Sequence, residues 1–236
     1  MRISPSLVAA GLLGLAPSPA AAQDWSGEAE IVSDYRWRGV SLSNRNPAAQ
    51  ASVEMEAGGF YLGGFGSWVP HGGGDAGLEL DASAGWRAAL DARLTLDGGV
   101  ALYHYPRARD CDYAEATATL GWERDAAEAR IGLAWAPRQP NLIDPAGARG
   151  DNLYGFAQLE QPIAGTPLSV SLEGGYEAGV FDGAVRGGKF DWHAGVSAEL
   201  GKFRLSAHYV GALRPRATVG ERRGEHGLVL ALGRSF

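Results

Sequence analysis

The sequence predicts an all-β protein: a transmembrane antiparallel up-and-down β-barrel of about twelve strands, with the N and C termini in the periplasm. Three observations predict this fold. Apolar and polar residues alternate with period two, short connections alternate with long ones, and tryptophans stand near the ends of the apolar registers. After residue 22 no apolar run reaches the roughly 20 residues that a spanning helix needs, so the sequence allows a closed barrel as its membrane-spanning structure.

The clearest alternation runs from Trp25 to Val40. One register is apolar with a tryptophan near each end, whereas the other carries five charges in seven residues. Successive side chains of a strand point to opposite faces, so two such different faces need two different surroundings. The twelve residues from Trp25 to Trp37 rise roughly 28 Å at about 3.4 Å per residue and a tilt near 45°. This rise is close to the apolar band of about 25 Å in an outer-membrane barrel, and we expect one strand over residues 25–40.

Eleven further segments alternate in the same way. They cover about residues 48–57, 60–69, 78–87, 93–106, 113–122, 127–135, 152–160, 168–178, 189–200, 203–211 and the end of the chain. The total of twelve is even, as in single-chain bacterial barrels. The links near residues 58, 90, 124, 164 and 202 are short, and in such barrels short turns are periplasmic and long loops are extracellular.

The seven tryptophans support lipid on the outside of the barrel. All of them fall on expected outward registers near a strand end, where they form membrane girdles: Trp25, Trp37, Trp68, Trp86, Trp122, Trp135 and Trp192. A soluble sandwich would concentrate its aromatic residues at the middle of the strands. The C-terminal Phe236 is expected to act as a signal to the barrel-assembly machinery.

The N-terminal 22 residues have the order of a cleavable signal peptide, with Arg2, an apolar run from Leu7 to Leu15 and three alanines before Gln23. Residues 23–236 are expected to form one domain, the barrel. They carry 20 Lys and Arg against 27 Asp and Glu, a net charge of −7, which argues against a nucleic-acid partner. Cys111 is the only cysteine. We expect a location in the cell outer membrane, with outer-membrane lipid and lipopolysaccharide as partners.

Several segments resemble a known family. They are SDYRWRGVSLS with the following PAAQ, GFYLGGFGSW, LDGGVALYHYPR, DYAEATATLGW, FDWHAGVSAEL and LALGRSF. In this order and spacing they are similar to the TorF family of porin-like proteins, also called the Gcw_chp family of bacterial proteins of unknown function. The resemblance extends along residues 23–236 and implies an outer-membrane barrel and a pore, with no catalytic residues. The long arginine-bearing loops and Cys111 depart from the family's pattern, so selectivity set by loops is not carried over.

The inward registers predict the lining of a lumen. Twelve strands spaced about 4.8 Å apart and tilted near 40° close at a backbone radius of roughly 12 Å. The expected pore-lining residues are Glu28, Glu30, Asp34, Arg36, Arg38, Glu54, Glu56, Glu79, Asp81, Arg93, Asp97, Glu115, Arg130, Glu173, Asp191 and His193. All inward registers together hold 15 acidic and 7 basic residues, a charge of −8, and rings of carboxylates favour cations.

These residues favour a porin-like channel for passive diffusion of small hydrophilic solutes or ions, with weak cation preference. One alternative is that the acids and bases pair across the interior and plug it, so that the barrel is a membrane anchor without conductance. Arg36 and Arg38 could form a constriction with Glu54 or a simple ion-pair network.

The second alternative is an outer-membrane hydrolase, which we consider and set aside, so no enzyme activity is expected. His104 faces outward, but alanines occupy the neighbouring strand and no nucleophile faces it. His71, Asp75, Asp110 and Asp112 lie in loops that are usually solvated turns. Adding Cys111 gives no known metal-site spacing, and the HGGGDAG stretch lacks the ending of a phosphate loop. No cofactor and no metal is expected.

Overall fold

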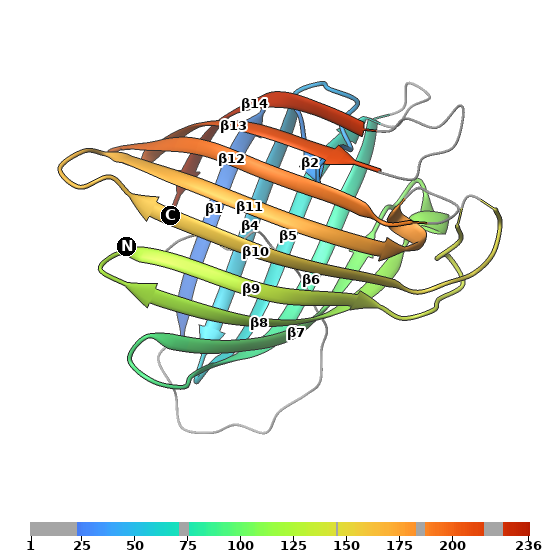
Figure 1. Ribbon diagram of the computed structural model, residues 1–236, viewed down its shortest axis with the longest axis horizontal. Helices are drawn as coiled ribbons and strands as arrows, with labels where there is room; N and C mark the ends of the chain where they lie inside the picture. The colour runs from blue at the N-terminus through green and yellow to red at the C-terminus, as the bar shows by residue number, and fades with distance from the viewer. Residues whose placement is uncertain (1–22, 71–75, 145, 183–186, 215–223) are drawn as a thin grey trace.

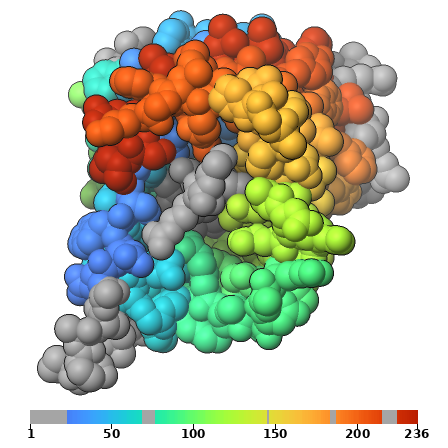
Figure 2. Space-filling model, turned by 90° about the vertical axis from the view of Figure 1, so that its left-hand side faces the viewer, coloured from blue at the N-terminus to red at the C-terminus, as the bar shows by residue number. Residues whose placement is uncertain are grey.

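The computed structural model describes residues 23–70, 76–144, 146–182, 187–214 and 224–236. Twelve strands in the described part of the chain form one closed antiparallel barrel, in which each strand pairs with its neighbour in sequence and β14 closes the ring against β1 (Figure 1). Seen along the barrel, the colours follow chain order around the ring until red meets blue (Figure 2). The all-β barrel and the count of twelve strands are therefore confirmed. The expected signal peptide, residues 1–22, lies outside the described residues.

Except for the first strand, the strand bounds lie close to those of the alternating segments in the sequence. The barrel strands are β1 (Asp24–Val32), β4 (Ala48–Ala57), β5 (Phe60–Pro70), β6 (Ala76–Ala89), β7 (Leu94–His104), β8 (Tyr113–Arg124), β9 (Ala127–Ala136), β10 (Asn152–Pro162), β11 (Leu168–Gly179), β12 (Lys189–Leu200), β13 (Phe203–Leu213) and β14 (Gly224–Ser235). Two single 3₁₀ turns, η1 (Arg109–Cys111) and η2 (Val180–Asp182), lie in the connections. No helix among the described residues is long and apolar enough to cross a membrane.

Short turns and long connections lie at opposite ends of the barrel, as Figure 1 shows. The short turns follow β4, β6, β8, β10 and β12, and we call this the short-turn end. The other end, the loop end, carries the longer connections. Strand β1 begins opposite Glu56 beside a short turn, and β14 ends opposite Glu28, so both ends of the barrel sheet lie at the short-turn end.

The outside of the barrel is apolar. Leu228 is 64% exposed and Ile131 is 59% exposed. Every barrel strand has at least one large apolar side chain that is exposed on its outward register. Such a surface would be a severe aggregation liability in water, whereas a closed barrel with all backbone groups paired is compatible with lipid. The barrel therefore belongs in an outer membrane.

Six of the seven expected girdle tryptophans lie on this outer surface. Trp25, Trp86 and Trp122 are near the short-turn end, and Trp68, Trp135 and Trp192 are near the loop end. The expected girdle position of Trp37 is wrong, because the first strand is shorter than the sequence indicates.

The predicted strand over residues 25–40 ends at Val32. Ser33 makes the last pairing with β14, where its N–H donates to the Leu230 carbonyl at 2.8 Å. The chain then turns inside the barrel and forms a short hairpin, β2 (Arg36–Trp37) and β3 (Val40–Ser41). We call residues 36–41 the inner hairpin. Tyr35, just before it, packs with Phe65 in an apolar cluster on the inner wall.

Candidate functional site in the barrel lumen

The inner hairpin crosses the lumen. It leaves the wall between β1 and β4, and its tip reaches residues on β8, β10 and β11. In the ring, β10 lies five strands from β1 in one direction and six strands from β4 in the other. The hairpin tip therefore contacts the opposite wall of the barrel.

Backbone geometry places Arg38 at that tip. Arg38 and Gly39 both have positive φ, 45° and 81°, as the two central residues of a type I′ hairpin turn require. An arginine at positive φ is uncommon, because its Cβ crowds the backbone. Gly39 also packs so closely against the backbone of Gly211 that a Cβ there would overlap the Gly211 carbonyl. The turn is thus wedged against β13.

The Arg38 guanidinium is enclosed by acids and aromatic rings. Its Nη2 donates to Glu115 Oε1 at 2.6 Å and its Nη1 to Glu177 Oε1 at 2.7 Å. Its carbon atom Cζ lies 4.8 Å from the ring centre of Trp37 and 4.2 Å from that of Tyr154. We call these five residues the Arg38 cluster.

The cluster is buried and electrostatically matched. The side chains of Arg38, Glu115 and Glu177 are at most 4% exposed. Burial alone would lower the pKa of Arg38, but the carboxylates of Glu115 and Glu177 raise it above its ordinary value, so the guanidinium stays charged. Removing one partner from such a buried pair leaves an uncompensated charge, which is costly.

The wall supplies its own partners to the cluster. Glu177 also accepts a hydrogen bond from Asn152 Nδ2 at 3.0 Å and forms an ion pair with Lys189. The Tyr154 hydroxyl donates to Asp191 at 2.9 Å. These contacts join β10, β11 and β12, so the acid and the ring that meet Arg38 are positioned by strands rather than by the hairpin.

Asp34 fixes the shape of the hairpin. Its carboxylate accepts hydrogen bonds from Arg36 Nε at 2.7 Å, Ser41 Oγ at 2.6 Å and Ser43 Oγ at 3.1 Å. The Ser41 N–H in turn donates to Glu225 on β14 at 2.7 Å. The conspicuous SDYRWRGVSLS segment is therefore a folded insertion in the lumen.

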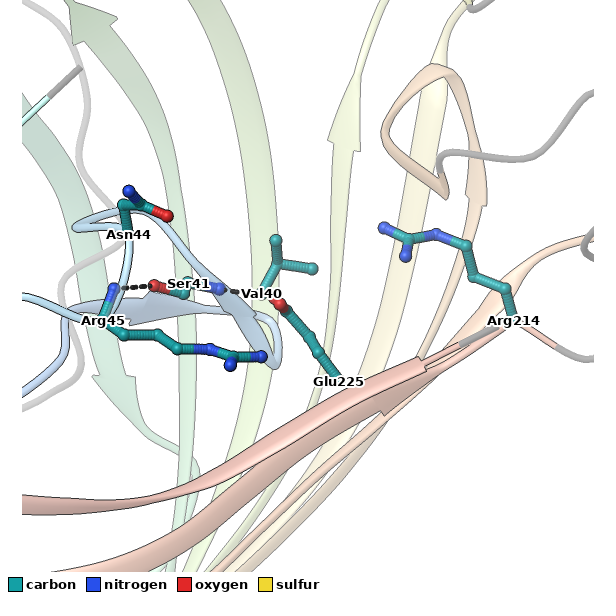
Figure 3. Close-up of a pocket in the computed structure, with 6 residues that line it drawn as sticks. All are labelled: Val40, Ser41, Asn44, Arg45, Arg214 and Glu225. Atoms are coloured by element: carbon teal, nitrogen blue, oxygen red, sulfur yellow. Dashed lines mark hydrogen bonds between the residues drawn. The ribbon is translucent and has the colours of Figure 1, made fainter. Parts of the chain in front are cut away.

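A cavity of about 260 Å³ opens at the base of the hairpin, toward the loop end (Figure 3). It is lined by Val40, Ser41, Asn44, Arg45, Arg214 and Glu225. In the close-up Arg45 extends from the hairpin side, whereas Arg214 comes from the opposite side, at the end of β13. The Arg45 N–H donates to Ser41 Oγ at 2.9 Å. This cavity brings solvent next to the hairpin.

A second charged cluster lies toward the short-turn end. Arg87 donates to Glu54 at 2.8 Å, to Glu56 at 3.1 Å and to Asp97 at 2.7 Å, and it stacks 4.3 Å from the ring centre of Tyr61. The suggested constriction of Arg36 and Arg38 with Glu54 is therefore wrong. Glu54 binds Arg87, and the two hairpin arginines have other partners.

Two buried acids on β6 have no basic partner in the described part of the chain. Glu79 is 2% and Asp81 is 8% exposed. The Tyr105 hydroxyl donates to Glu79 Oε1 at 3.0 Å. Glu79 Oε2, Asp81 Oδ1 and the neighbouring hydroxyls of Ser83 and Tyr103 have no hydrogen-bond partner among the described residues. The lumen thus contains acidic groups that are not neutralised by ion pairs.

The predicted pore-lining residues divide into three groups. On the inward face of barrel strands lie Glu28, Glu30, Glu54, Glu56, Glu79, Asp81, Asp97, Glu115, Arg130, Glu173, Asp191 and His193. Asp34, Arg36 and Arg38 lie inside the barrel on or beside the inner hairpin, not on the wall. Arg93 lies in the exposed turn between β6 and β7, so its place on a strand is wrong.

Sequence reasoning missed the aromatic members of the Arg38 cluster. Trp37 lies inside the barrel. Its ring centre is 5.6 Å from that of Tyr103 in an edge-on arrangement, and Tyr103 itself stacks on Tyr113 with 4.3 Å between ring centres. The signal for Trp37 was the Arg38-Gly39 pair after it, a turn sequence inside an alternating run. His193 contacts His208 of the next strand in the lumen, a pairing that no pattern in one strand could indicate.

The described loops contain one histidine–aspartate pair. His104 Nδ1 lies 2.8 Å from Asp112 Oδ2, and Asp112 also accepts the Tyr105 N–H. Desolvation would raise the pKa of Asp112, but Tyr105 and His104 together lower it. Among the described residues, the exposed thiol of Cys111 makes no hydrogen bond to this pair. His71 and Asp75 lie outside the described residues, and no group of three or more His, Cys, Asp or Glu in the described ranges could hold a metal.

Comparisons with known proteins agree with the barrel. A family model described as "Bacterial protein of unknown function (Gcw_chp)" matches residues 16–236. No curated protein matches the chain.

Solved structures resemble it in fold. The KdgM porin in complex with disordered oligogalacturonate has a TM-score of 0.59 at 7% identity, covering 89% of this chain and 98% of that chain. The NanC porin has a TM-score of 0.57 at 10% identity, covering 90% and 99%. An outer-membrane channel from Pseudomonas putida F1 has a TM-score of 0.54 at 14% identity, covering 100% of both chains.

Proposed function

The chain belongs to the Gcw_chp family of bacterial proteins of unknown function, and on that premise we propose that it is a porin-like channel for small hydrophilic solutes with a weak preference for cations. The observation that carries the proposal is the acidic lumen enclosed by a closed barrel. Similarity in fold to the KdgM and NanC porins supports it. In this proposal the long loops are extracellular, the short turns are periplasmic, residues 1–22 are removed as a signal peptide, and Phe236 addresses the chain to the barrel-assembly machinery.

The charge of the lumen supports cation preference. When Arg93 is removed from the residues expected on the inward registers, 15 acidic and 6 basic ones remain, a formal charge of −9. The Arg38 and Arg87 clusters neutralise some of the acids, while Glu79 and Asp81 have no such partner. A cation entering this space meets an excess of carboxylates, which lowers its energy relative to an anion.

The inner hairpin limits the size of the solute. It spans the lumen at the level of the Arg38 cluster, where Glu115 and Glu177 are at most 1% exposed. Between this level and the short-turn end the lining is more open, since Glu28, Glu30 and Glu54 are partly exposed. The channel in this proposal is therefore narrowest in its loop-end half.

Planar bilayer recordings test the proposal. Under a tenfold potassium chloride gradient the purified protein should give discrete conductance steps, with a reversal potential displaced toward the potassium equilibrium value. An Asp81→Asn, Glu79→Gln variant should displace it less. Anion-directed reversal potentials would reject the charge argument, and an absence of steps would reject the channel.

A second candidate, the plugged barrel, is favoured by one observation. The inner hairpin reaches from β1 and β4 to the opposite wall, where the side chains of Arg38, Glu115 and Glu177 have almost no exposed surface. If that contact is permanent, the protein is a membrane anchor without conductance. The same recordings separate the two candidates.

A further inference from the structure

We infer that Arg38 occupies a binding site for guanidinium groups, and that a small guanidinium solute takes the same site when the inner hairpin leaves it. This inference rests on the proposed channel function, because it names the class of solute that the lumen would select. The site that the solute would enter consists of Glu115, Tyr154 and Glu177 on the wall, whereas Trp37 belongs to the hairpin.

The wall residues match a planar cation rather than a simple positive charge. Glu115 and Glu177 accept from two different terminal nitrogens of Arg38, at 2.6 and 2.7 Å. A guanidinium carries its donors in a fixed plane and stacks on aromatic rings, as it does here on Tyr154 at 4.2 Å. An ammonium ion is a compact point charge without a flat face, so it cannot combine two hydrogen bonds in a plane with stacking of that plane on an aromatic ring.

Two of the three wall residues of the site are positioned by strands rather than by the hairpin. Glu177 is held by Asn152 and Lys189, and the Tyr154 hydroxyl is held by Asp191. All of these residues belong to strands of the closed barrel. When Arg38 is absent, Glu177 and Tyr154 keep these partners, and together with Glu115 on β8 they present a buried acidic pocket.

The hairpin is a short occupant with a strained tip. It consists of two strands of two residues each, and its tip residue Arg38 has a φ of 45°. A residue held at such a φ costs free energy unless its surroundings compensate. Part of this compensation comes from the contacts of the Arg38 guanidinium with Glu115, Glu177 and Tyr154. A free guanidinium solute would make the same contacts, so solute and Arg38 compete for one site.

Competition with a tethered side chain has a quantitative consequence. The tether gives Arg38 an effective concentration on the order of millimolar or above. The apparent affinity for a solute is therefore the intrinsic affinity multiplied by the small fraction of sites that Arg38 leaves vacant. Removal of Arg38 should therefore raise the affinity for a guanidinium solute by at least about tenfold.

Ligand binding to the detergent-solubilised full chain tests the inference. Methylguanidinium is titrated against the wild type, Arg38→Ala, and Arg38→Ala with Glu115→Gln and Glu177→Gln, with thermal unfolding as a second readout. We expect saturable binding and a rise in Tm in Arg38→Ala, binding at least tenfold weaker in the wild type, and loss of binding in the triple variant. Arg38→Gln, which keeps side-chain length, replaces Arg38→Ala if that variant does not fold.

Two further probes identify the chemistry. Methylammonium carries the charge without the plane, and urea has the plane without the charge, so both should bind Arg38→Ala at least tenfold more weakly than methylguanidinium. Equal binding of methylammonium, equal affinity in wild type and Arg38→Ala, or binding that survives in the triple variant would overturn the inference. Binding in detergent requires no conduction, so its failure leaves the channel proposal standing, and silent bilayers leave the binding result intact.

Discussion

At the scale of single residues, the lumen separates charges that are paired from charges that are not. Arg38 binds two carboxylates on the far wall, whereas Glu79 and Asp81 on β6 each have one buried carboxylate oxygen that accepts no hydrogen bond from the described residues. A buried polar atom without a partner costs free energy, and a charged one costs more. These two acids therefore destabilise the barrel in exchange for a negative lumen.

Replacing one of these acids should stabilise the protein. Asp81→Asn replaces a buried carboxyl group that has no basic partner while keeping the size of the side chain, and we expect the free energy of unfolding to rise by about 1–3 kcal/mol. The measurement is the temperature at which the barrel loses its fast migration in unboiled gel samples.

Glu128→Gln is the matched control for this change. Glu128 also faces inward, but it lies 3.7 Å from Arg130 and is partly exposed, so its replacement should change stability by less than about 1 kcal/mol. A loss of stability in Asp81→Asn would show that its carboxylate has a stabilising partner.

At the scale of elements, the inner hairpin is the feature that distinguishes this barrel from a plain cylinder of strands. Gly39 is its critical backbone position, because it combines a φ of 81° with close packing on Gly211. The hairpin is placed by a turn that few residues can make.

Gly39→Ala should displace the hairpin without unfolding the barrel. The left-handed backbone costs a Cβ-bearing residue roughly 1–2 kcal/mol, and the new methyl group overlaps the Gly211 carbonyl. We expect Trp37 to become accessible to a water-soluble quencher such as iodide, as measured by fluorescence.

Gly58→Ala serves as the control. Gly58 also has positive φ, 60°, but it lies in a short turn with open space around it. Its replacement should leave Trp37 quenching as in the wild type. Equal quenching in Gly39→Ala and wild type would contradict the placement of the hairpin.

The elements also show how far the sequence could predict the structure. Period two predicted eleven barrel strands, because each strand contacts lipid on one side and the lumen on the other. Successive residues along such a strand therefore alternate between apolar and polar. It failed over residues 33–40, since a two-residue hairpin continues the same alternation on both of its strands. The inner lining could be listed, but its pairing could not. Arg38 meets Glu115 and Glu177 at separations of 77 and 139 residues, and closure of the ring alone brings them together.

At the scale of the whole molecule, the barrel has an outside in contact with lipid and an inside crossed by one hairpin. Trp135, 47% exposed, belongs to the outside, and Trp37 belongs to the inside. Brominated acyl chains quench only tryptophans that they can touch.

Quenching in brominated-lipid vesicles should therefore separate the two classes. Trp135→Phe should reduce the fluorescence that bromolipid quenches, whereas Trp37→Phe should leave it unchanged and remove only unquenched emission. The measurement compares emission in brominated and ordinary vesicles. A clear loss of quenchable fluorescence in Trp37→Phe would show that Trp37 contacts lipid on the outer surface and would contradict its position inside the barrel.

The central claim is that the inner hairpin, held by Arg38, restricts the lumen of an otherwise continuous barrel. Single-channel recording of a chain in which residues 36–41 are replaced by a short Gly-Ser link tests it most directly. The account predicts conductance steps several times larger than those of the wild type, with cation preference retained. Steps of wild-type size, or none in either chain, would contradict it.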